Sequence, residues 1–244
     1  MKKKIIIISI IGILLLGLAI FLYFSSRQKT NVAEQPPIPK PAFLPNDTST
    51  SYLPISNSSN DQEINNTLKK ITEEPISTDE KNKGIKWTRF GVDSSHIILL
   101  DDFSRASGLK INTDVKSILN GRSYEVFNCP NNAGGKDFGL TLYFKVLGSF
   151  SDSSLDLKKW LAEWESTMFT DTHTIIFPNM NFTNADLKQD IKFKDGKYRY
   201  AEIILPDGSK GSLNYSMIGG NAIVISSSVK CLDAAAASIA PVEP

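Results

Sequence analysis

The chain has 244 residues and carries 27 lysine and arginine side chains against 26 aspartate and glutamate side chains, which gives a formal net charge of +1. Binding along a nucleic-acid backbone needs clustered lysine and arginine, so this balance excludes a general polyanion binder. Hydrophobic residues make up 41% of the chain, an ordinary share for a globular protein. The sequence therefore predicts one folded domain and no nucleic-acid partner.

Residues 5–24 form a continuous apolar segment without a charged side chain. A helix of about twenty residues covers about 30 Å, which is the thickness of the hydrocarbon core of a membrane. Three lysines, beginning at Lys2, precede the segment, whereas only Arg27 and Lys29 follow it closely. By the positive-inside rule, this predicts a cytoplasmic tip at 1–4, a transmembrane signal anchor at 5–24 and a C-terminal part outside the cytoplasm.

Two other interpretations of the segment stay open. A cleaved signal peptide has a shorter apolar core followed by small residues in an A-x-A pattern, and the residues from Phe24 to Gln28 lack that pattern. A type IV pilin leader would place a glutamate inside the apolar segment, and residues 5–24 contain none. The expected location is therefore the cell membrane, with a single span.

Residues 25–84 are rich in proline, serine and asparagine, and most of the chain's prolines lie between Pro36 and Pro75. Such a composition buries too little apolar surface to offset the entropy of ordering the chain. The segment is predicted to be a disordered linker that holds the domain away from the membrane. Ile64, Leu68 and Ile71 have helical spacing and allow one short helix around 61–73.

Residues 85–240 show the periodicity of a folded domain. Alternating apolar residues from Phe138 to Val146 predict a half-buried strand, and residues 122–129 are its expected antiparallel neighbour. The short apolar run from His96 to Asp101 predicts a buried strand. Three further strands, at 198–205, 210–217 and 222–229, are separated by tight turns and should form an antiparallel meander.

One long amphipathic helix is predicted between Leu155 and Phe169, preceded by Ser153 at a capping-box spacing from Asp156. Its apolar face carries five residues at helical spacing: Leu157, Trp160, Leu161, Trp164 and Met168. The two tryptophans pack in the core or, alternatively, form a wall for ligand stacking. A short helix at 232–239 and a tail at 241–244 follow the last strand. The predicted class is α+β, with an antiparallel sheet packed against these two helices on one face.

Cys129 and Cys231 are the two cysteines, and both lie on the predicted extracytoplasmic side, where oxidation is allowed. A disulfide between them would join the end of a strand to the start of the last helix. Two free buried thiols are the alternative.

His96 and His173 are the two histidines. A zinc site would need both with carboxylates, or an H-x-x-x-H spacing, and the sequence has neither. Asp171 and His173 form a dyad only if the fold brings a serine beside them, and a surface or capping role for His173 is the simpler interpretation. The sequence therefore predicts no catalytic residue, no cofactor-binding residue and no metal ligand.

Two other patterns are weak. Adjacent Asp101 and Asp102 lack the D-x-D-x-D-G loop of a calcium site, so local capping or solvation is expected. The run from Gly134 to Asp137 fails as a phosphate loop, because Pro130 occupies the place of the first glycine and Asp137 that of the serine or threonine.

Basic residues are concentrated in one stretch: Lys188, Lys192, Lys194, Lys197 and Arg199. If Lys192 and Lys194 lie on a strand, they share one face and could contact anionic lipid headgroups or an acidic wall polymer. A solvated edge strand protected by lysines is the simpler interpretation.

Taken together, these features predict a membrane-anchored, non-enzymatic module that binds a protein or polymer partner in the cell envelope. A ligand-sensing or hydrolytic domain, or an accessory subunit of a membrane complex, is the alternative.

Overall fold

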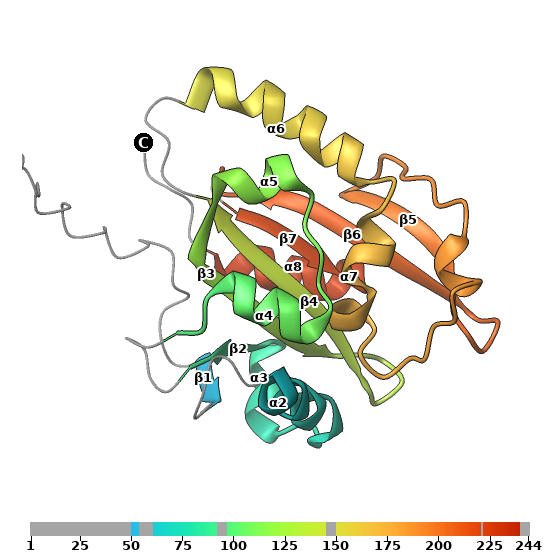
Figure 1. Cartoon of the computed structure of the whole chain (residues 1–244). Coiled ribbons are helices and arrows are strands. Elements are labelled where there is room, and N and C mark those ends of the chain that lie inside the picture. The colour runs from blue at the N-terminus through green and yellow to red at the C-terminus, as the bar shows by residue number, and fades with distance from the viewer. Residues whose placement is uncertain (1–49, 54–60, 92–96, 145–149, 221, 240–244) are drawn as a thin grey trace, which may run out of the picture. The chain divides into compact units, whose positions relative to one another are not determined.

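The computed structural model describes residues 50–53, 61–91, 97–144, 150–220 and 222–239, with the elements shown in Figure 1. The predicted cytoplasmic tip, the predicted transmembrane helix at 5–24, most of the predicted linker and the tail at 241–244 lie outside these residues. No helix in the described ranges has the length and apolar character needed to cross a membrane.

The described strands form one sheet with the order β1-β2-β3-β4-β7-β6-β5. β1 pairs with β2 in parallel, and all other neighbouring strands are antiparallel. The strands are β1 (Thr50–Leu53), β2 (Lys86–Phe90), β3 (Leu119–Pro130), β4 (Lys136–Phe144), β5 (Arg199–Ile204), β6 (Lys210–Ile218) and β7 (Ala222–Ser226). The predicted hairpin of β3 and β4 and the predicted meander of β5, β6 and β7 are confirmed.

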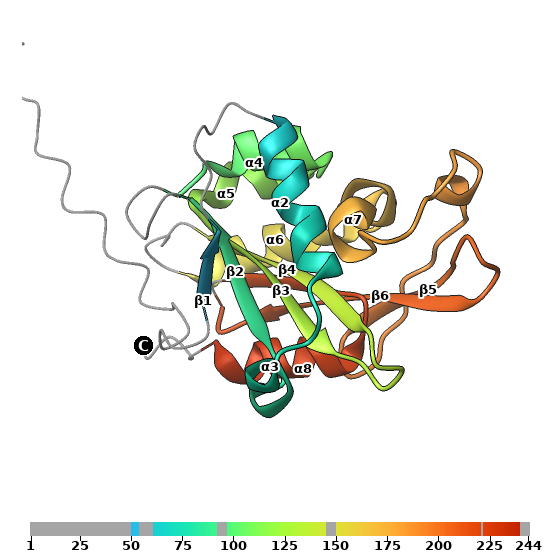
Figure 2. The same cartoon turned by 90° about the horizontal axis from the view of Figure 1, so that it is seen from below.

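Helices cover both faces of the sheet, as the turned view in Figure 2 shows. They are α2 (Asp61–Glu73), α3 (Thr78–Lys83), α4 (Leu100–Ser107), α5 (Thr113–Ile118), α6 (Phe150–Trp164), α7 (Met168–Ile176) and α8 (Val229–Ser238), with a short 3₁₀ helix η1 (Asp186–Lys188). A large core lies between the sheet and α2, α4, α5, α6 and α7, and a smaller one lies under α8. The class is α+β as predicted, but the prediction of helices on one face is wrong.

The central strand β4 explains this arrangement. Its even-numbered residues, such as Leu140 and Leu142, belong to the large core. Gly139, Thr141 and Tyr143 alternate with them and are also buried, on the α8 face. A Cβ on Gly139 would lie 2.1 Å from the ring of Phe127, so only glycine lets that ring lie against the strand. β4 is therefore buried on both faces rather than half-buried as its sequence predicts.

The folded domain begins well before Ile85. The predicted short helix around 61–73 is confirmed as α2, whose Ile64 and Ile71 are buried in the large core. α3 follows with a capping box, in which Ser77 and Glu80 bond each other's backbone N–H groups. The prediction of a disordered linker is therefore wrong for residues 61–84, because the buried face of α2 offsets the entropy of ordering them.

The predicted strand at 96–101 is also wrong. His96 lies outside the described residues, Ile97 forms only an isolated bridge with Gly91, and Leu100 begins helix α4. The apolar run is too short to distinguish a strand from a helix, and Phe103 and Ala106 continue the helical spacing that begins at Leu100.

The predicted long helix is divided into α6 and α7 at residues 165–167. The hydroxyl of Ser166 bonds the carbonyl of Glu163, and that of Thr167 bonds the carboxylate of Asp171 at 2.7 Å. Such side-chain bonds to nearby groups compete with the helical hydrogen bonds. The helix also begins at Phe150, so Ser153 lies within it and is not its N-cap.

A buried ion pair lies on the α8 face of the central strands. The Arg89 guanidinium bonds the Glu125 carboxylate at 2.7 Å, and the Tyr143 hydroxyl donates to the same carboxylate at 2.8 Å. Burial raises the pKa of Glu125, while the charge of Arg89 and the bond from Tyr143 oppose that rise. Removing the charge of Arg89 or of Glu125 would leave the other charge buried without a partner. We therefore expect the two residues to act as a unit.

The sulfur atoms of Cys129 and Cys231 lie 2.04 Å apart, at the distance of a disulfide bond. Both residues are buried in the smaller core, where Cys129 is the next-to-last residue of β3 and Cys231 lies in the first turn of α8. A covalent bond there would attach α8 to the sheet.

We expect the double substitution C129A/C231A to lower the free energy of unfolding by about 2–5 kcal/mol, because the bond closes a loop of about 100 residues in the unfolded chain. The measurement is denaturant unfolding followed by circular dichroism, with and without reductant. The reductant should shift the unfolding midpoint of the wild type and leave that of the double variant unchanged. An equal midpoint for the wild type in both conditions would show that the thiols are free.

Candidate functional site

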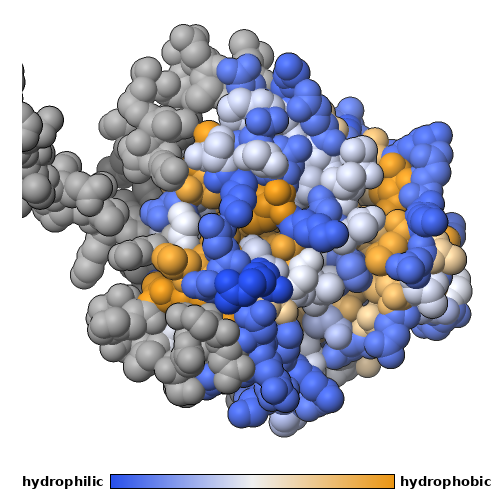
Figure 3. Space-filling view, viewed as in Figure 1, coloured by the Kyte–Doolittle hydropathy of each residue, from blue (hydrophilic) through white to orange (hydrophobic). Residues whose placement is uncertain are grey.

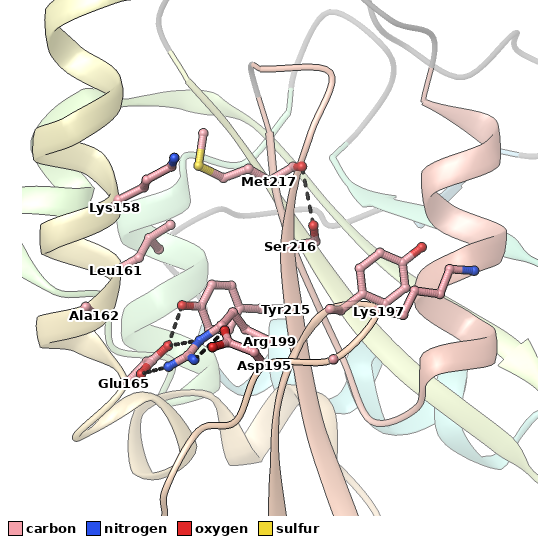
Figure 4. A pocket seen from close by; sticks show the side chains of 12 residues that line it. Lys158, Leu161, Ala162, Glu165, Asp195, Lys197, Arg199, Tyr215, Ser216 and Met217 are labelled. Carbon is pink, nitrogen blue, oxygen red and sulfur yellow. Dashed lines mark hydrogen bonds and ion pairs between the residues drawn. The ribbon is translucent and has the colours of Figure 1, made fainter.

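A groove of about 510 Å³ lies between α6 and the strands β5 and β6 (Figure 4). Its wall on one side is α6, and on the other it is the loop at 195–198 together with the end of β6. The residues that line it are Lys158, Leu161, Ala162, Glu165, Asp195, Gly196, Lys197, Tyr198, Arg199, Tyr215, Ser216 and Met217.

Arg199, the first residue of β5, is the centre of the groove's polar network. Its Nε and Nη2 donate to the two carboxylate oxygens of Glu165 at 2.9 and 2.7 Å, and its Nη1 donates to Oδ1 of Asp195 at 2.8 Å. The bonds to Glu165 and Asp195 raise the pKa of Arg199. A bidentate pair of this kind fixes both planar groups in orientation as well as in distance.

Tyr215 completes the surroundings of Glu165 from β6. Its hydroxyl donates to Oε1 of Glu165 at 2.6 Å, and its side chain is buried. Burial, and then the bond to Glu165, raise the pKa of Tyr215. The ring of Phe193 contacts the tyrosine ring at a centroid distance of 5.5 Å. The carboxylate of Glu165 therefore accepts three hydrogen bonds and is only 15% exposed.

The loop is held on its other side by α8. Lys197 lies 2.6 Å from the carboxylate of Asp233, and the Tyr198 hydroxyl donates to the same oxygen at 2.5 Å. Burial and this bond raise the pKa of Tyr198 to about 12. Because neighbouring residues of an extended chain point to opposite faces, Arg199 reaches the α6 side while Tyr198 reaches the α8 side.

The basic stretch predicted from the sequence is neutralised by nearby carboxylates. Lys192 lies 3.1 Å from Asp190, and Lys194 lies 3.8 Å from Glu202. Lys197 and Arg199 have the partners given above, and Lys188 lies exposed on η1. The structure therefore contradicts a continuous free basic surface along this segment.

The same segment covers the outer edge of β5. The backbone of Lys194 exchanges two hydrogen bonds with that of Tyr200, at 2.7 and 3.1 Å. The side-chain amide of Gln189 exchanges two more with the backbone of Ile204, both at 2.7 Å. Lys192 and Phe193 do not lie on a strand, contrary to the alternation inferred for them, because the chain here protects an edge rather than extending the sheet.

Asp171 and His173 do not form the dyad considered from the sequence. Oδ2 of Asp171 accepts bonds from the Trp164 indole at 2.9 Å and from the Thr167 hydroxyl at 2.7 Å. Nδ1 of His173 lies 2.8 Å from the carbonyl of Thr170. Both residues stabilise α7 and the end of α6.

The other candidates from the sequence also have local partners. Asp101 pairs with Lys116 at 2.7 Å and Asp102 with Arg105 at 2.8 Å, both at α4. Trp164 is fully buried, which excludes it from a stacking wall. Across the described ranges, no three histidine, cysteine or carboxylate side chains gather as metal ligands do.

Glu165, Arg199 and Tyr215 were not singled out as a site by the sequence. Arg199 lies 34 residues and Tyr215 lies 50 residues after Glu165, and no short motif connects the three. Glu165 directly follows the last residue of α6, Trp164, so the helical spacing of the sequence does not place its side chain. The one available signal is Arg199 itself, a charged residue at an inward position of a predicted strand.

No family model, curated protein or solved structure matches this chain.

The contact of Tyr198 with Asp233 gives a test of the loop's attachment to α8. We expect D233N to lower the pKa of Tyr198 from about 12 toward its usual value of about 10, because the substitution removes the carboxylate that disfavours the phenolate. Burial is the larger cause, so the shift should be partial. Absorbance of tyrosinate as the pH rises measures it, with Y198F to assign the transition.

The sign of the linked effect on stability follows from the same shift. The folded state holds the Tyr198 proton more tightly than the unfolded state, so the contact stabilises fully below about pH 10 and is lost as the pH rises toward 12. Identical tyrosinate curves for D233N and the wild type would contradict the contact.

Proposed function

We propose that this chain is a single-pass membrane protein whose α+β domain is a non-enzymatic binding module of the cell envelope. The observation that carries the proposal is the groove between α6 and the strands β5 and β6. Its volume of about 510 Å³ falls within the usual range of ligand sites, about 300–1,000 Å³. Its lining combines apolar side chains with a few convergent polar groups, which is the usual character of such sites.

The groove is formed in advance of any ligand. Its loop is bonded to Glu165 through Arg199 and to Asp233 through Lys197 and Tyr198. Side chains that are already held in one orientation lose little entropy when a ligand binds, so more of the contact energy appears as affinity. This arrangement favours recognition of a partner without requiring the domain to refold.

The sequence supplies the membrane part of the proposal. The uncharged segment at 5–24 has the length of a membrane span, and the lysines before it favour a cytoplasmic N-terminus. The proline-rich composition that follows is typical of a spacer. The domain would then meet its partner at some distance from the lipid surface.

Labelling of single introduced cysteines tests the location. Cys129 and Cys231 are buried, so a cysteine introduced at an exposed position is the reactive thiol of the domain. We expect K159C, on the exposed face of α6, to react with a membrane-impermeant maleimide on spheroplasts. K3C should react only after the membrane is permeabilised. The reverse pattern, or recovery of the K159C protein in the soluble fraction, would overturn the proposal.

A further inference from the structure

We infer that the groove between α6 and the strands β5 and β6 binds an uncharged glycan chain. This inference rests on the proposed function, because it takes the groove as the binding site of the module. It adds the chemical class of the ligand.

Three basic and two acidic side chains line the groove, and their formal charges cancel once Asp233 beside it is counted. Of the three bases, Lys158 has no ion pair within the described part of the chain. Arg199 is shared between Glu165 and Asp195, and Lys197 is paired with Asp233 beside the groove. An anionic polymer would bring its phosphates or carboxylates close to Glu165 and Asp195, and it would have to compete for guanidinium donors that are already engaged. The balance therefore favours a ligand without net charge over an acidic wall polymer or a lipid headgroup.

The hydrogen-bonding groups that remain suit hydroxyls. A guanidinium has five N–H donors, and the bonds of Arg199 to Glu165 and Asp195 use one N–H on each of its three nitrogens, which leaves one donor on Nη1 and one on Nη2. Asp195 is 91% exposed and bonds Arg199 through Oδ1, so its second oxygen can accept. A sugar hydroxyl both donates and accepts, so neighbouring hydroxyls can bond this donor and this acceptor together.

The apolar part of the lining is small and suits the C–H face of a sugar ring. It consists of Leu161 and Ala162 from α6 and Met217 from β6. On the face shown in Figure 3, hydrophobic residues appear in patches separated by hydrophilic ones rather than as one continuous area. An amphipathic helix needs a longer apolar stripe than this groove provides.

An extended peptide would bind by adding a strand to an open sheet edge. The nearby edge, β5, is covered by backbone bonds from Lys194 and side-chain bonds from Gln189. β6 is paired on both sides, with β5 and β7. The described backbone around the groove therefore has no open strand edge with which a peptide could pair. The glycan remains the ligand that both the charge and the hydrogen bonds of the groove favour.

The test uses the full chain in detergent micelles and titration calorimetry with a tetramer of β-1,4-linked N-acetylglucosamine. Two substitutions on α6 form a matched pair. A162W fills the groove, whereas K159W adds the same side chain at an exposed position of the same helix that does not line the groove. We expect A162W to weaken binding at least tenfold and K159W to leave it within about twofold of the wild type.

A second matched pair removes a polar contact instead of adding bulk. Asp195 and Asp190 are both highly exposed and each pairs with one basic residue, but only Asp195 lines the groove. We expect D195A to weaken binding of the tetramer and D190A to leave it unchanged. Because the ligand is uncharged, raising the salt concentration should leave the affinity of the wild type nearly constant.

Absence of binding by the tetramer, or equal binding by A162W and the wild type, would overturn the inference. Poly(glycerol phosphate) and an unstructured peptide are the comparison probes. If either binds and A162W blocks it, the glycan is the wrong ligand class while the proposed function stands. If the labelling experiment instead places the domain on the cytoplasmic side, the proposed function is wrong. Binding of the tetramer in the groove would then still support a glycan as the class of ligand.

Discussion

The bidentate pair between Arg199 and Glu165 is the interaction on which the arrangement of the groove depends. It connects the first residue of β5 to the residue that follows α6, and Tyr215 of β6 bonds the same carboxylate. Exposed ion pairs contribute about 0–1 kcal/mol, but a pair that is partly buried and geometrically fixed contributes more. Without it, the bond from Tyr215 to Glu165 would be the one remaining polar link described between the end of α6 and these strands.

The sheet supplies the rigid base for that interaction. Its central strands are buried on both faces, by a large core on one side and by α8 on the other. The buried pair of Arg89 and Glu125 and the close approach of Cys129 to Cys231 fix the α8 face. α8 in turn carries Asp233, which holds Lys197 and Tyr198 of the loop. The groove's geometry is thus set from both sides of the sheet.

Features encoded by nearby residues could be predicted from the sequence, and features that depend on distant partners could not. The spacing of Ile64, Leu68 and Ile71 indicated α2, and the glycines after Pro206 and Ile218 indicated the turns of the meander. The alternation in β4 was correct, but threonine and glycine on its second face gave no sign that α8 covers them. The partnership of Glu165 with Arg199 depends on a contact between residues 34 positions apart, which no local pattern records.

The function proposed here follows from a neutral, preformed groove on a domain whose sequence predicts a membrane anchor. Its central physical claim is that Arg199 and Glu165 act as one unit. A double-mutant cycle with R199M and E165Q, measured by denaturant unfolding, tests that claim most directly. The account predicts a coupling free energy of about 1–3 kcal/mol between the two sites. Effects of the single substitutions that add to the double within about 0.3 kcal/mol would contradict it.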